Sequence, residues 1–443
     1  MIDLKDRPHS LIENFESLGG LLEASGPAFW IERRRTALER FQAVGIPTHK
    51  DEEWKYTSLN LLRENRFAPA YGATVDREHI AKSPAAAVDA ATIAFVNGQE
   101  APELAIPRNL PNGVFVGTLA EASQQIPEVV ELWLGNVATY QGKLGSTNDP
   151  RFIDLNTAYL TEGAVVYVPK NTIVEDPIHV LFASQADHDV FAAFPRLLII
   201  LGENSQAKVL ESYIGLTGTY FNCSVTEVAL AKSAILEHDK FQHETLDAVH
   251  IANIAVHQEG SSTYTSNNIS FGAAVGRNDI NVWVDGEHCE TWLNGTYVAT
   301  GDQISDNHTR IDHALPNCNS FEVYKGILGD RAQGVFNGKI FVYEDAQKTD
   351  AKQTNQAILL SPTASIDTKP QLEIFADDVK CTHGATVGQL KEDAKFYLRS
   401  RGIPEKEADA ILVYAFAAEV IEKVAAQEVR EALEKVLFEK LKQ

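Results

Sequence analysis

Three hydrophobic patterns follow one another along the chain, and the first of them is helical. Between about residues 10 and 44, apolar side chains recur at spacings of three and four, which is typical of amphipathic helices. Gly45-Ile46-Pro47 ends this region, because glycine suits the position after a helix and proline prevents its continuation. A strand that enters a turn is expected at residues 92–98, and further helices are expected around 128–134 and 152–160.

The second pattern is a long series of short strands that begins at Gly163. Apolar segments at 164–169, 178–182 and 196–201 are followed by more of the same kind, and helical spacing is absent for roughly two hundred residues. Gly, Asn, Asp or Ser residues stand between the segments, as in Gly202-Glu203-Asn204-Ser205. The middle of the chain is therefore predicted to be all β.

Weak internal echoes indicate how these strands are arranged. Val209-Leu210-Glu211 resembles Ile235-Leu236-Glu237, and Leu293-Asn294-Gly295-Thr296 resembles Phe336-Asn337-Gly338-Lys339. The spacings are irregular, so a strict repeat is not established. A coil of stacked strands explains the short strands, the frequent turns and the echoes better than a closed barrel does.

The third pattern is helical again and begins after Gly388. Apolar residues at helical spacing run from Phe396 to Val420, and a last helix is expected at 429–441. Helices on either side of a coil could cover its open ends. We therefore divide the chain into a helical and mixed region (1–160), a β coil (161–384) and a helical domain (385–443).

Composition excludes several classes of protein. The chain has 443 residues, 44% of them hydrophobic, and its 39 Lys and Arg against 61 Asp and Glu give a formal net charge of -22. Such an acidic chain repels phosphate backbones, so nucleic acid is not an expected partner. The N-terminus lacks the features of a secretory signal and no apolar run is long enough to cross a bilayer, so we expect a cytoplasmic protein without membrane contact. Its four scattered cysteines do not support a disulfide framework or a zinc finger.

The strongest candidate chemistry lies at the junction between the β region and the C-terminal helices. In an extended segment Val379, Cys381 and His383 should point to the same side, with about 6 to 7 Å between alternate Cα atoms. The thiol and the imidazole could then converge on one soft metal ion or sulfur species. The alternative is that Cys381 packs as a small hydrophobe and that His383 is a hydrogen-bonded structural residue.

Two other groups of residues provide the alternative hypothesis of a β-helical or cupin-like metalloenzyme. Neither group has a compact ligand motif, so hydrogen bonding at turns and strand ends is the default interpretation. The first group is His238, His243, His250 and His257 with Glu237 and Glu244, and the second is His288, Cys289, His308, His313 and Cys318.

Two further kinds of catalytic site are not supported. The segment 334–340 lacks the glycine spacing and the hydroxyl of a phosphate-binding loop, so we expect no ATP to be bound by this chain. No Gly-x-Ser-x-Gly motif indicates a serine hydrolase.

The run Cys381 to Gly388, followed by Phe396 to Ile403, resembles the SufB/SufD family of iron-sulfur cluster assembly proteins. The resemblance is clear across 311–416 and looser upstream. Asp51-Glu52-Glu53-Trp54-Lys55-Tyr56-Thr57 and Gly384 favour the SufD branch. Blocks that match the family in the same order are Tyr324-Lys325-Gly326, Gly338-Lys339-Ile340, residues 346–351 with Gln353, and Leu372-Glu373-Ile374.

This resemblance implies a mainly β protein with a right-handed parallel β-helix core between N-terminal and C-terminal α-helical domains. It implies a non-enzymatic scaffold subunit that works with a SufB-like scaffold and a SufC-like ABC-type ATPase. The strands near Cys381 and His383 would face SufB, and the isolated chain could instead form a homodimer. The C-terminal helices would bind SufC, and the candidate contact residues are Phe396, Tyr397, Arg401, Ile411 and Phe416.

The implied cargo is a transient iron-sulfur cluster, or iron, held at a subunit interface. We expect His383 to be the main ligand, because a neutral imidazole binds iron without losing a proton, whereas a thiol with a pKa of about 8.5 must first be activated. Cys381 would assist or only pack. A third hypothesis is a purely structural subunit whose partner provides every ligand.

Overall fold

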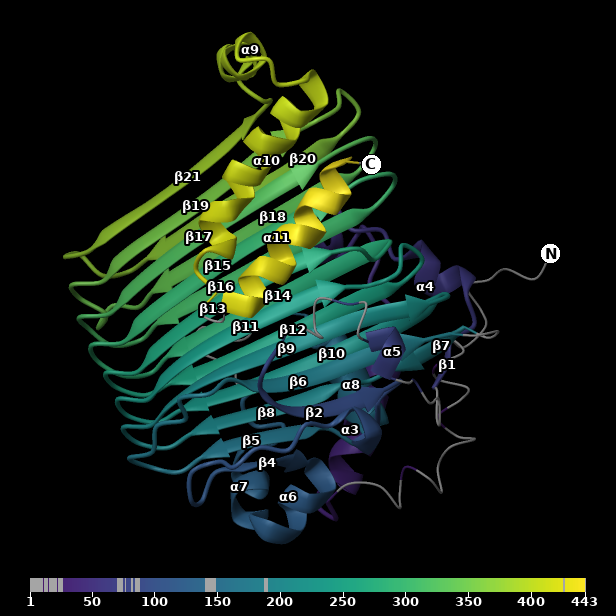
Figure 1. The fold of residues 1–443 in the computed structure, drawn as a ribbon. Coiled ribbons are helices and arrows are strands. Elements are labelled where there is room, and N and C mark those ends of the chain that lie inside the picture. The colour runs from purple at the N-terminus through teal and green to yellow at the C-terminus, as the bar shows by residue number, and fades with distance from the viewer. Residues whose placement is uncertain are drawn as a thin grey trace.

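The described residues form a parallel β-helix with helical segments before and after it in sequence (Figure 1). The computed structural model describes residues 27–69, 88–139, 149–186, 190–424 and 427–442, together with 11, 15, 22, 75, 77–80 and 83. This architecture confirms the predicted fold class.

Two sheets face each other, and the chain alternates between them as it climbs the coil (Figure 1). Sheet A runs in the order β20-β18-β16-β14-β12-β10-β8-β5-β4, with β7 and β1 beside it; its strands are β1 (Ala68–Pro69), β4 (Phe115–Thr118), β5 (Ala164–Val168), β7 (Phe191–Ala193), β8 (Arg196–Leu201), β10 (Tyr220–Leu230), β12 (Val249–Gln258), β14 (Val275–Val284), β16 (Ile304–His313), β18 (Gln333–Val342) and β20 (Ser365–Ile374). Sheet B runs in the order β21-β19-β17-β15-β13-β11-β9-β6-β2-β3; its strands are β2 (Ala91–Val96), β3 (Gln99–Glu100), β6 (Ile178–Gln185), β9 (Gln206–Thr217), β11 (Ile235–His243), β13 (Thr263–Phe271), β15 (Glu290–Ala299), β17 (Asn319–Leu328), β19 (Asp350–Leu359) and β21 (Lys380–Gly388).

The core lies between the two sheets, where equivalent side chains of successive circuits stack on one another. From β8 onward, register partners within a sheet are 26 to 32 residues apart, as in Val249 with Val275 and Gln333 with Ser365. One such column of β-branched side chains, all buried, crosses sheet A and consists of Val228, Val256, Val282, Ile311 and Ile340. Branched side chains fit this stacking because few rotamers are lost on a pleated surface.

Tight turns connect the strands and use residues with positive φ. Asn204, Ser233, Ser261 and Asp330 all have φ between 51° and 60°, which small polar residues tolerate better than most. His288 has a φ of 61° in one such turn, directly before β15. Small polar residues therefore form turns between the strands as predicted, and His288, a candidate ligand of the second group, occupies a turn of the same kind.

Most helices of the first part of the chain pack on the outer face of sheet A, whereas the short helices at 77–80 and 102–104 pack against sheet B (Figure 1). The structure confirms the helices expected around 128–134 and 152–160 and the strand at 92–96, and residues 11, 15 and 22 are helical. The remaining part of the predicted helical stretch before 27 lies outside the described residues. The helices are α3 (Trp30–Val44), α4 (Asn60–Glu64), α5 (Arg77–Ile80), α6 (Leu119–Gln125), α7 (Pro127–Trp133) and α8 (Arg151–Tyr159), with 3-10 helices η2 (Glu52–Trp54) and η4 (Pro102–Leu104).

The acidic and aromatic stretch 51–57 docks onto sheet A. The guanidinium carbon of Arg277 lies 3.8 Å from the centroid of the Trp54 ring. Glu53 Oε1 lies 2.6 Å from Lys339 Nζ. The segment, which includes η2, therefore ties the N-terminal part of the chain to strands that follow it by more than two hundred residues.

Helices α9 (Glu392–Ser400), α10 (Glu405–Ile421) and α11 (Gln427–Lys442) follow the β-helix (Figure 1). Helix α10 packs on the outer face of sheet B against β13, β15 and β17, and α11 packs beside α10. These two helices therefore cover a face of the coil and do not close its end. None of the helices described here is long and apolar enough to cross a bilayer.

The predicted division of the chain at 160/161 and 384/385 stays a prediction. Strands β2 and β4, which precede residue 160, join sheets B and A. Strand β21 continues to Gly388, beyond the second predicted division. Pairing across both positions is therefore part of the β-helix.

Candidate functional site

Strand β21 contains both candidate ligands and forms the last strand of sheet B (Figure 1). It pairs in parallel with β19 and, among the described residues, with no other strand. Cys381 lies opposite Ala351, and His383 lies opposite Gln353. Because side chains alternate along a strand, Cys381 and His383 are on the same face, with about 6 to 7 Å between their Cα atoms.

The two candidate ligands differ in exposure. Cys381 is half-buried against Val342, Ala351 and Ala376, and its burial raises the pKa of the thiol. The thiol is therefore protonated near neutral pH unless a metal or a base activates it. His383 is exposed. The imidazole is thus the ligand that is accessible without prior activation.

The end of the coil around these ligands is apolar and open. Ile374 is 40% exposed, Phe375 53% and Val387 46%. These residues lie on or beside β20 and β21, the terminal strands of the two sheets. A terminal strand also presents unpaired backbone N–H and C=O groups, which makes such an edge a template for pairing with another chain.

A column of inward-facing polar side chains lies below His383. The register places Glu322 on β17 next to Gln353 on β19, and Gln353 next to His383 on β21. Gln353 Nε2 donates a hydrogen bond of 2.7 Å to Glu322 Oε2. Burial raises the pKa of Glu322 to about 7. The sequence prediction quoted Gln353 only as part of the family resemblance, and only the strand register places it next to His383.

The first histidine group of the metalloenzyme hypothesis is divided between the interior and the surface. His238 is buried, with its ring nitrogens 2.9 Å from Glu211 Oε2 and 3.1 Å from the Tyr264 hydroxyl. His250 is also buried, with Nε2 3.1 Å from Lys240 Nζ and Nδ1 3.0 Å from a Glu244 carboxylate oxygen. His243 and His257 are half-buried at other positions, and Glu237 is on the outer face. Polar groups inside the coil thus already lie beside the nitrogens of both buried rings.

The second group is divided among three places. His288 is exposed in its turn, and His308 lies on the outer face of sheet A, 3.4 Å from Glu53. His313 is inside the coil, where Nε2 lies 2.9 Å from the Ser320 hydroxyl. Cys289 and Cys318 both hydrogen-bond to the Gly286 carbonyl oxygen, at 3.4 and 3.0 Å. In the part of the chain that the structure describes, no group of three or more His, Cys, Asp and Glu residues is arranged to hold a metal ion.

The five candidate partner-binding residues of the C-terminal helices are not equivalent. Phe396 is 75% exposed, Tyr397 58% and Ile411 38%. Arg401 is exposed, and its guanidinium lies 5.2 Å from the Tyr397 ring centroid. Phe416 is half-buried against the core beneath α10, with Lys325 Nζ 4.7 Å from its ring centroid. Four of the five therefore form the accessible part of this surface.

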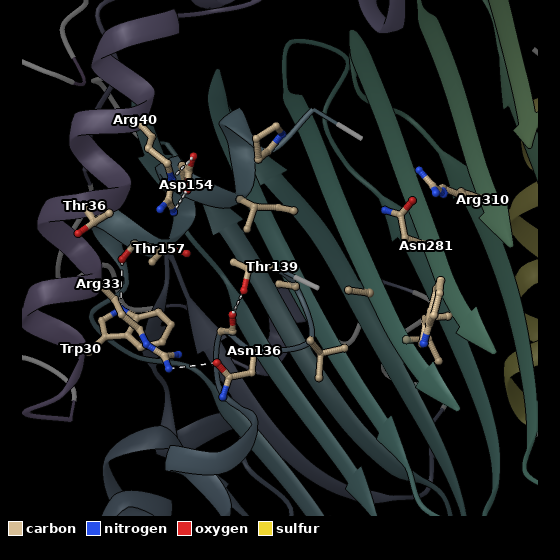
Figure 2. A pocket seen from close by; sticks show the side chains of 18 of the residues that line it. Trp30, Arg33, Thr36, Arg40, Asn136, Thr139, Asp154, Thr157, Asn281 and Arg310 are labelled. Carbon is tan, nitrogen blue, oxygen red and sulfur yellow. Dashed lines mark hydrogen bonds and ion pairs between the residues drawn. The ribbon is translucent and has the colours of Figure 1, made fainter. Parts of the chain in front are cut away.

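A cavity of about 690 Å³ lies away from these residues, between α3, α8 and the outer face of sheet A (Figure 2). Figure 2 shows Arg40 paired with Asp154 across the gap between α3 and α8. Arg310 and Asn281 lie on the sheet side, and Arg310 pairs with Asp312. These ion pairs neutralise much of the charge that lines the cavity. The cavity is not part of the candidate ligand site.

The fold defines a parallel β-helical protein with two candidate ligands, Cys381 and His383, on the last strand at its open end. Comparison with known families agrees with this class. Residues 182–416 match the model of the SufBD core domain of the SUF system for FeS cluster assembly, and residues 6–180 match that of the SufBD protein N-terminal region. The chain belongs to the SufBD family of iron-sulfur cluster assembly proteins.

Individual relatives are similar over most of the chain. An iron-sulfur cluster assembly SufBD family protein of Synechocystis sp. is 32% identical over 403 residues, which are 89% of this chain and 87% of the relative. The iron-sulfur cluster assembly protein SufD of Escherichia coli is 30% identical over 388 residues, 87% of each chain. Protein ABCI7, chloroplastic, of Arabidopsis thaliana is 30% identical over 426 residues, 94% of this chain and 87% of the relative.

Proposed function

We propose that this SufBD family protein is a scaffold subunit that builds and transfers nascent iron-sulfur clusters together with a SufB-like scaffold and a SufC-like ABC-type ATPase. The chain itself would have no enzymatic turnover and would bind no ATP. The observation that supports this role is the position of Cys381 and His383, two soft ligands on the last strand of an open sheet. Cytoplasmic location, or an equivalent reducing compartment, is part of the same proposal.

The open end supports a shared site. Two side chains are too few to hold a cluster permanently, and the apolar surface beside them favours contact with another protein. A second β-helix with its own terminal strand matches both features, since it would pair with β21 and cover Phe375 and Val387. The SufB-like scaffold is the proposed partner, and a second copy of this chain could occupy the same end when the partner is missing.

The cargo would be held by ligands from both subunits. His383 offers a lone pair without deprotonation, and Cys381 can add a thiolate when the metal displaces its proton. Mixed ligation across an interface suits release, because separation of the subunits removes ligands from the cargo. The cluster, or its iron, is therefore substrate rather than a resident cofactor.

The surface formed by Phe396, Tyr397, Arg401 and Ile411 is the proposed contact for the ATPase. Large exposed aromatic side chains together with an arginine are typical of residues that dominate binding energy at protein interfaces. Helix α9 follows β21 after only a short connection. Movement of an ATPase bound to this surface could therefore be transmitted to the strand that contains the ligands.

Ligand substitution tests the cluster role. The chain is coexpressed with its SufB-like and SufC-like partners, purified as a complex and reconstituted with iron and sulfide without oxygen. We expect His383→Ala to lower cluster yield at least tenfold while the complex stays intact, and Cys381→Ser to have a smaller effect. Unchanged yield in His383→Ala would favour the purely structural subunit, whereas a stoichiometric metal with turnover in the isolated chain would favour the metalloenzyme.

Surface substitution tests the ATPase contact. Phe396→Asp combined with Tyr397→Ala should abolish copurification of the ATPase while the SufB-like partner is retained. Leu246→Asp is the matched control, because Leu246 is 60% exposed on a loop between β11 and β12. Apolar residues of α10 such as Val413 and Val420 are unsuitable for this test, since they are buried in the molecule's own core. Retained ATPase binding in the double variant would contradict the proposed contact.

A further inference from the structure

The buried amide of Gln353 lies at the floor of the proposed ligand site. Gln353 is 2% exposed and is the register partner of the exposed His383. Both side chains are on the inward face of sheet B, on neighbouring strands about 4.8 Å apart. Imidazole and amide are thus adjacent members of one column, and no strand lies between them.

The hydrogen bonds of Gln353 fix which end of the amide is available. Its Nε2 donates to Glu322 Oε2 at 2.7 Å, so the nitrogen is committed to the next circuit of the coil. Its Oε1 has no hydrogen-bond partner, although it is buried. A buried acceptor without a partner is destabilising, so an N–H group that reached Oε1 would be stabilised there.

The opposite sheet leaves room for this amide. A Cβ atom placed on Gly338 of β18 would lie 2.1 Å from Gln353 Nε2 and 2.7 Å from its Cδ. Any larger residue at position 338 would therefore displace the amide. The glycine and the carboxyl group of Glu322 together hold the Gln353 side chain in one place.

A neutral imidazole has one N–H donor and one nitrogen lone pair. We propose that Gln353 is a positioning residue for His383: when the exposed ring turns toward the coil, the unpartnered amide oxygen accepts the N–H of one ring nitrogen, so that the lone pair of the other nitrogen points toward the open end. This inference rests on the proposed role of His383 as a ligand, and it adds the group that selects the tautomer. Outer-shell hydrogen bonds of this kind orient metal-binding histidines and increase their basicity.

Asn355 provides a matched comparison on the same strand. It is also 2% exposed, and its Oδ1 also has no hydrogen-bond partner. Its register partner, however, is Ala385, which has no side-chain donor. Removal of the Asn355 carbonyl should therefore leave the His383 ring unaffected, and removal of the Gln353 carbonyl should not.

The test measures the tautomer of His383 directly. The full chain is labelled with ¹⁵N-histidine and studied by long-range ¹H–¹⁵N NMR at about pH 8.5, where an ordinary imidazole is neutral. His383→Gln identifies the signal among the 13 histidines. We expect a single tautomer of His383 in the parent chain and a mixture of tautomers in Gln353→Met. Both Asn355→Leu and Glu322→Gln keep the Gln353 amide and should show the parent tautomer. A mixture in the parent chain, or an unchanged signal in Gln353→Met, would overturn the inference.

Reconstitution of the complex separates this inference from the proposed function. If both hold, Gln353→Met lowers cluster yield at limiting iron about tenfold or more, as expected for loss of an outer-shell partner, and Asn355→Leu does not. Should Gln353→Met lose the single tautomer while His383→Ala leaves cluster yield unchanged, the ligand role fails although the ring is positioned as inferred. A single tautomer in Gln353→Met, combined with loss of clusters in His383→Ala, rejects only the role of Gln353.

Discussion

Glu53 anchors the docking segment 51–57, and its replacement offers a quantitative test of how the N-terminal part is held. One carboxylate oxygen lies 2.6 Å from Lys339 Nζ, and the other lies 3.4 Å from His308 Nδ1. Glu53→Gln keeps the shape of the side chain and removes its charge. The buried end of Lys339 then loses its carboxylate partner, whereas His308 loses Glu53 but keeps Asp306, whose Oδ1 lies 3.0 Å from Nε2.

The expected loss lies between that of a surface pair and that of a buried pair. The side chain of Glu53 is 21% exposed, Lys339 10% and His308 11%. Exposed pairs contribute about 0–1 kcal/mol, and breaking a fully buried pair costs about 3–5 kcal/mol. We therefore expect the opening free energy of the docking segment to fall by about 2 kcal/mol, which is about a 30-fold increase in the population of the open state.

Hydrogen exchange measures this local opening without requiring the whole β-helix to unfold. The amides of Trp54 and Thr57 are suitable reporters, since they bond to the carbonyl oxygens of Asp51 and Trp54. At pH 7 they should exchange about 30-fold faster in Glu53→Gln than in the parent chain. Glu52→Gln is the control, because the Glu52 side chain, which pairs with Lys369, is 67% exposed. The amides of Trp54 and Thr57 should exchange at the parent rate in this variant.

The pH dependence makes the test stricter. Burial alone would raise the pKa of Glu53, but hydrogen bonds with His308 and Lys339 outweigh it and lower the pKa from 4.5 to about 2. The stabilisation is thus complete above pH 4.5 and is lost as the pH falls from 4.5 toward 2. The difference between parent and variant should therefore be smaller at pH 3 than at pH 7. Equal exchange of parent and variant at pH 7, or a difference that does not shrink on acidification, would refute the reasoning.

Two further predictions concern the interior of the coil. Burial raises the pKa of Glu322 from 4.5 to about 7, so the native state favours the protonated carboxyl group. The stability that this group contributes is present below pH 4.5 and is lost as the pH rises to 7. Urea unfolding should therefore show that Glu322→Gln exceeds the parent in unfolding free energy by about 3 kcal/mol at pH 8 and by nothing at pH 4.5. Gly295→Ala should destabilise the chain by about 1–3 kcal/mol, because the new Cβ would lie 2.2 Å from Cε1 of the buried Tyr324 ring. Gly388→Ala, where nothing lies within 4 Å, should leave the urea midpoint unchanged.

Local patterns predicted the elements of this fold well, because each depends on its own residues. The short continuous apolar run in 196–201 and the helical spacing of 152–160 gave the correct types for β8 and α8. The register between strands could not be predicted in the same way. Leu236 pairs with Ala207 and not with its echo Leu210, and Asn294 and Asn337 lie on different sheets. Since the circuits vary between 26 and 32 residues, similar short sequences do not mark stacked positions.

The candidate site shows the same limit. Alternation within one strand predicted a common face for Cys381 and His383, which is a local property. The neighbour of His383 on the next strand, Gln353, follows only from the register. Likewise, apolar residues at helical spacing predicted the helix that is α10, but only the tertiary structure shows that Val413 and Val420 are buried in the molecule's own core.

The two ends of the β-helix differ in a way that bears on where a shared site can form. At the first end, the antiparallel strands β3 and β4 interrupt parallel pairing, and α6 packs against β4 and β5. At the last end, β20 and β21 have no further strand beside them among the described residues. A histidine such as His238 in the interior has both ring nitrogens engaged by Glu211 and Tyr264 and has none to offer to a metal. His383 occupies the same inward column five circuits further on, at the open end, where it is exposed, and in the proposed complex the second chain would add its ligands at this position.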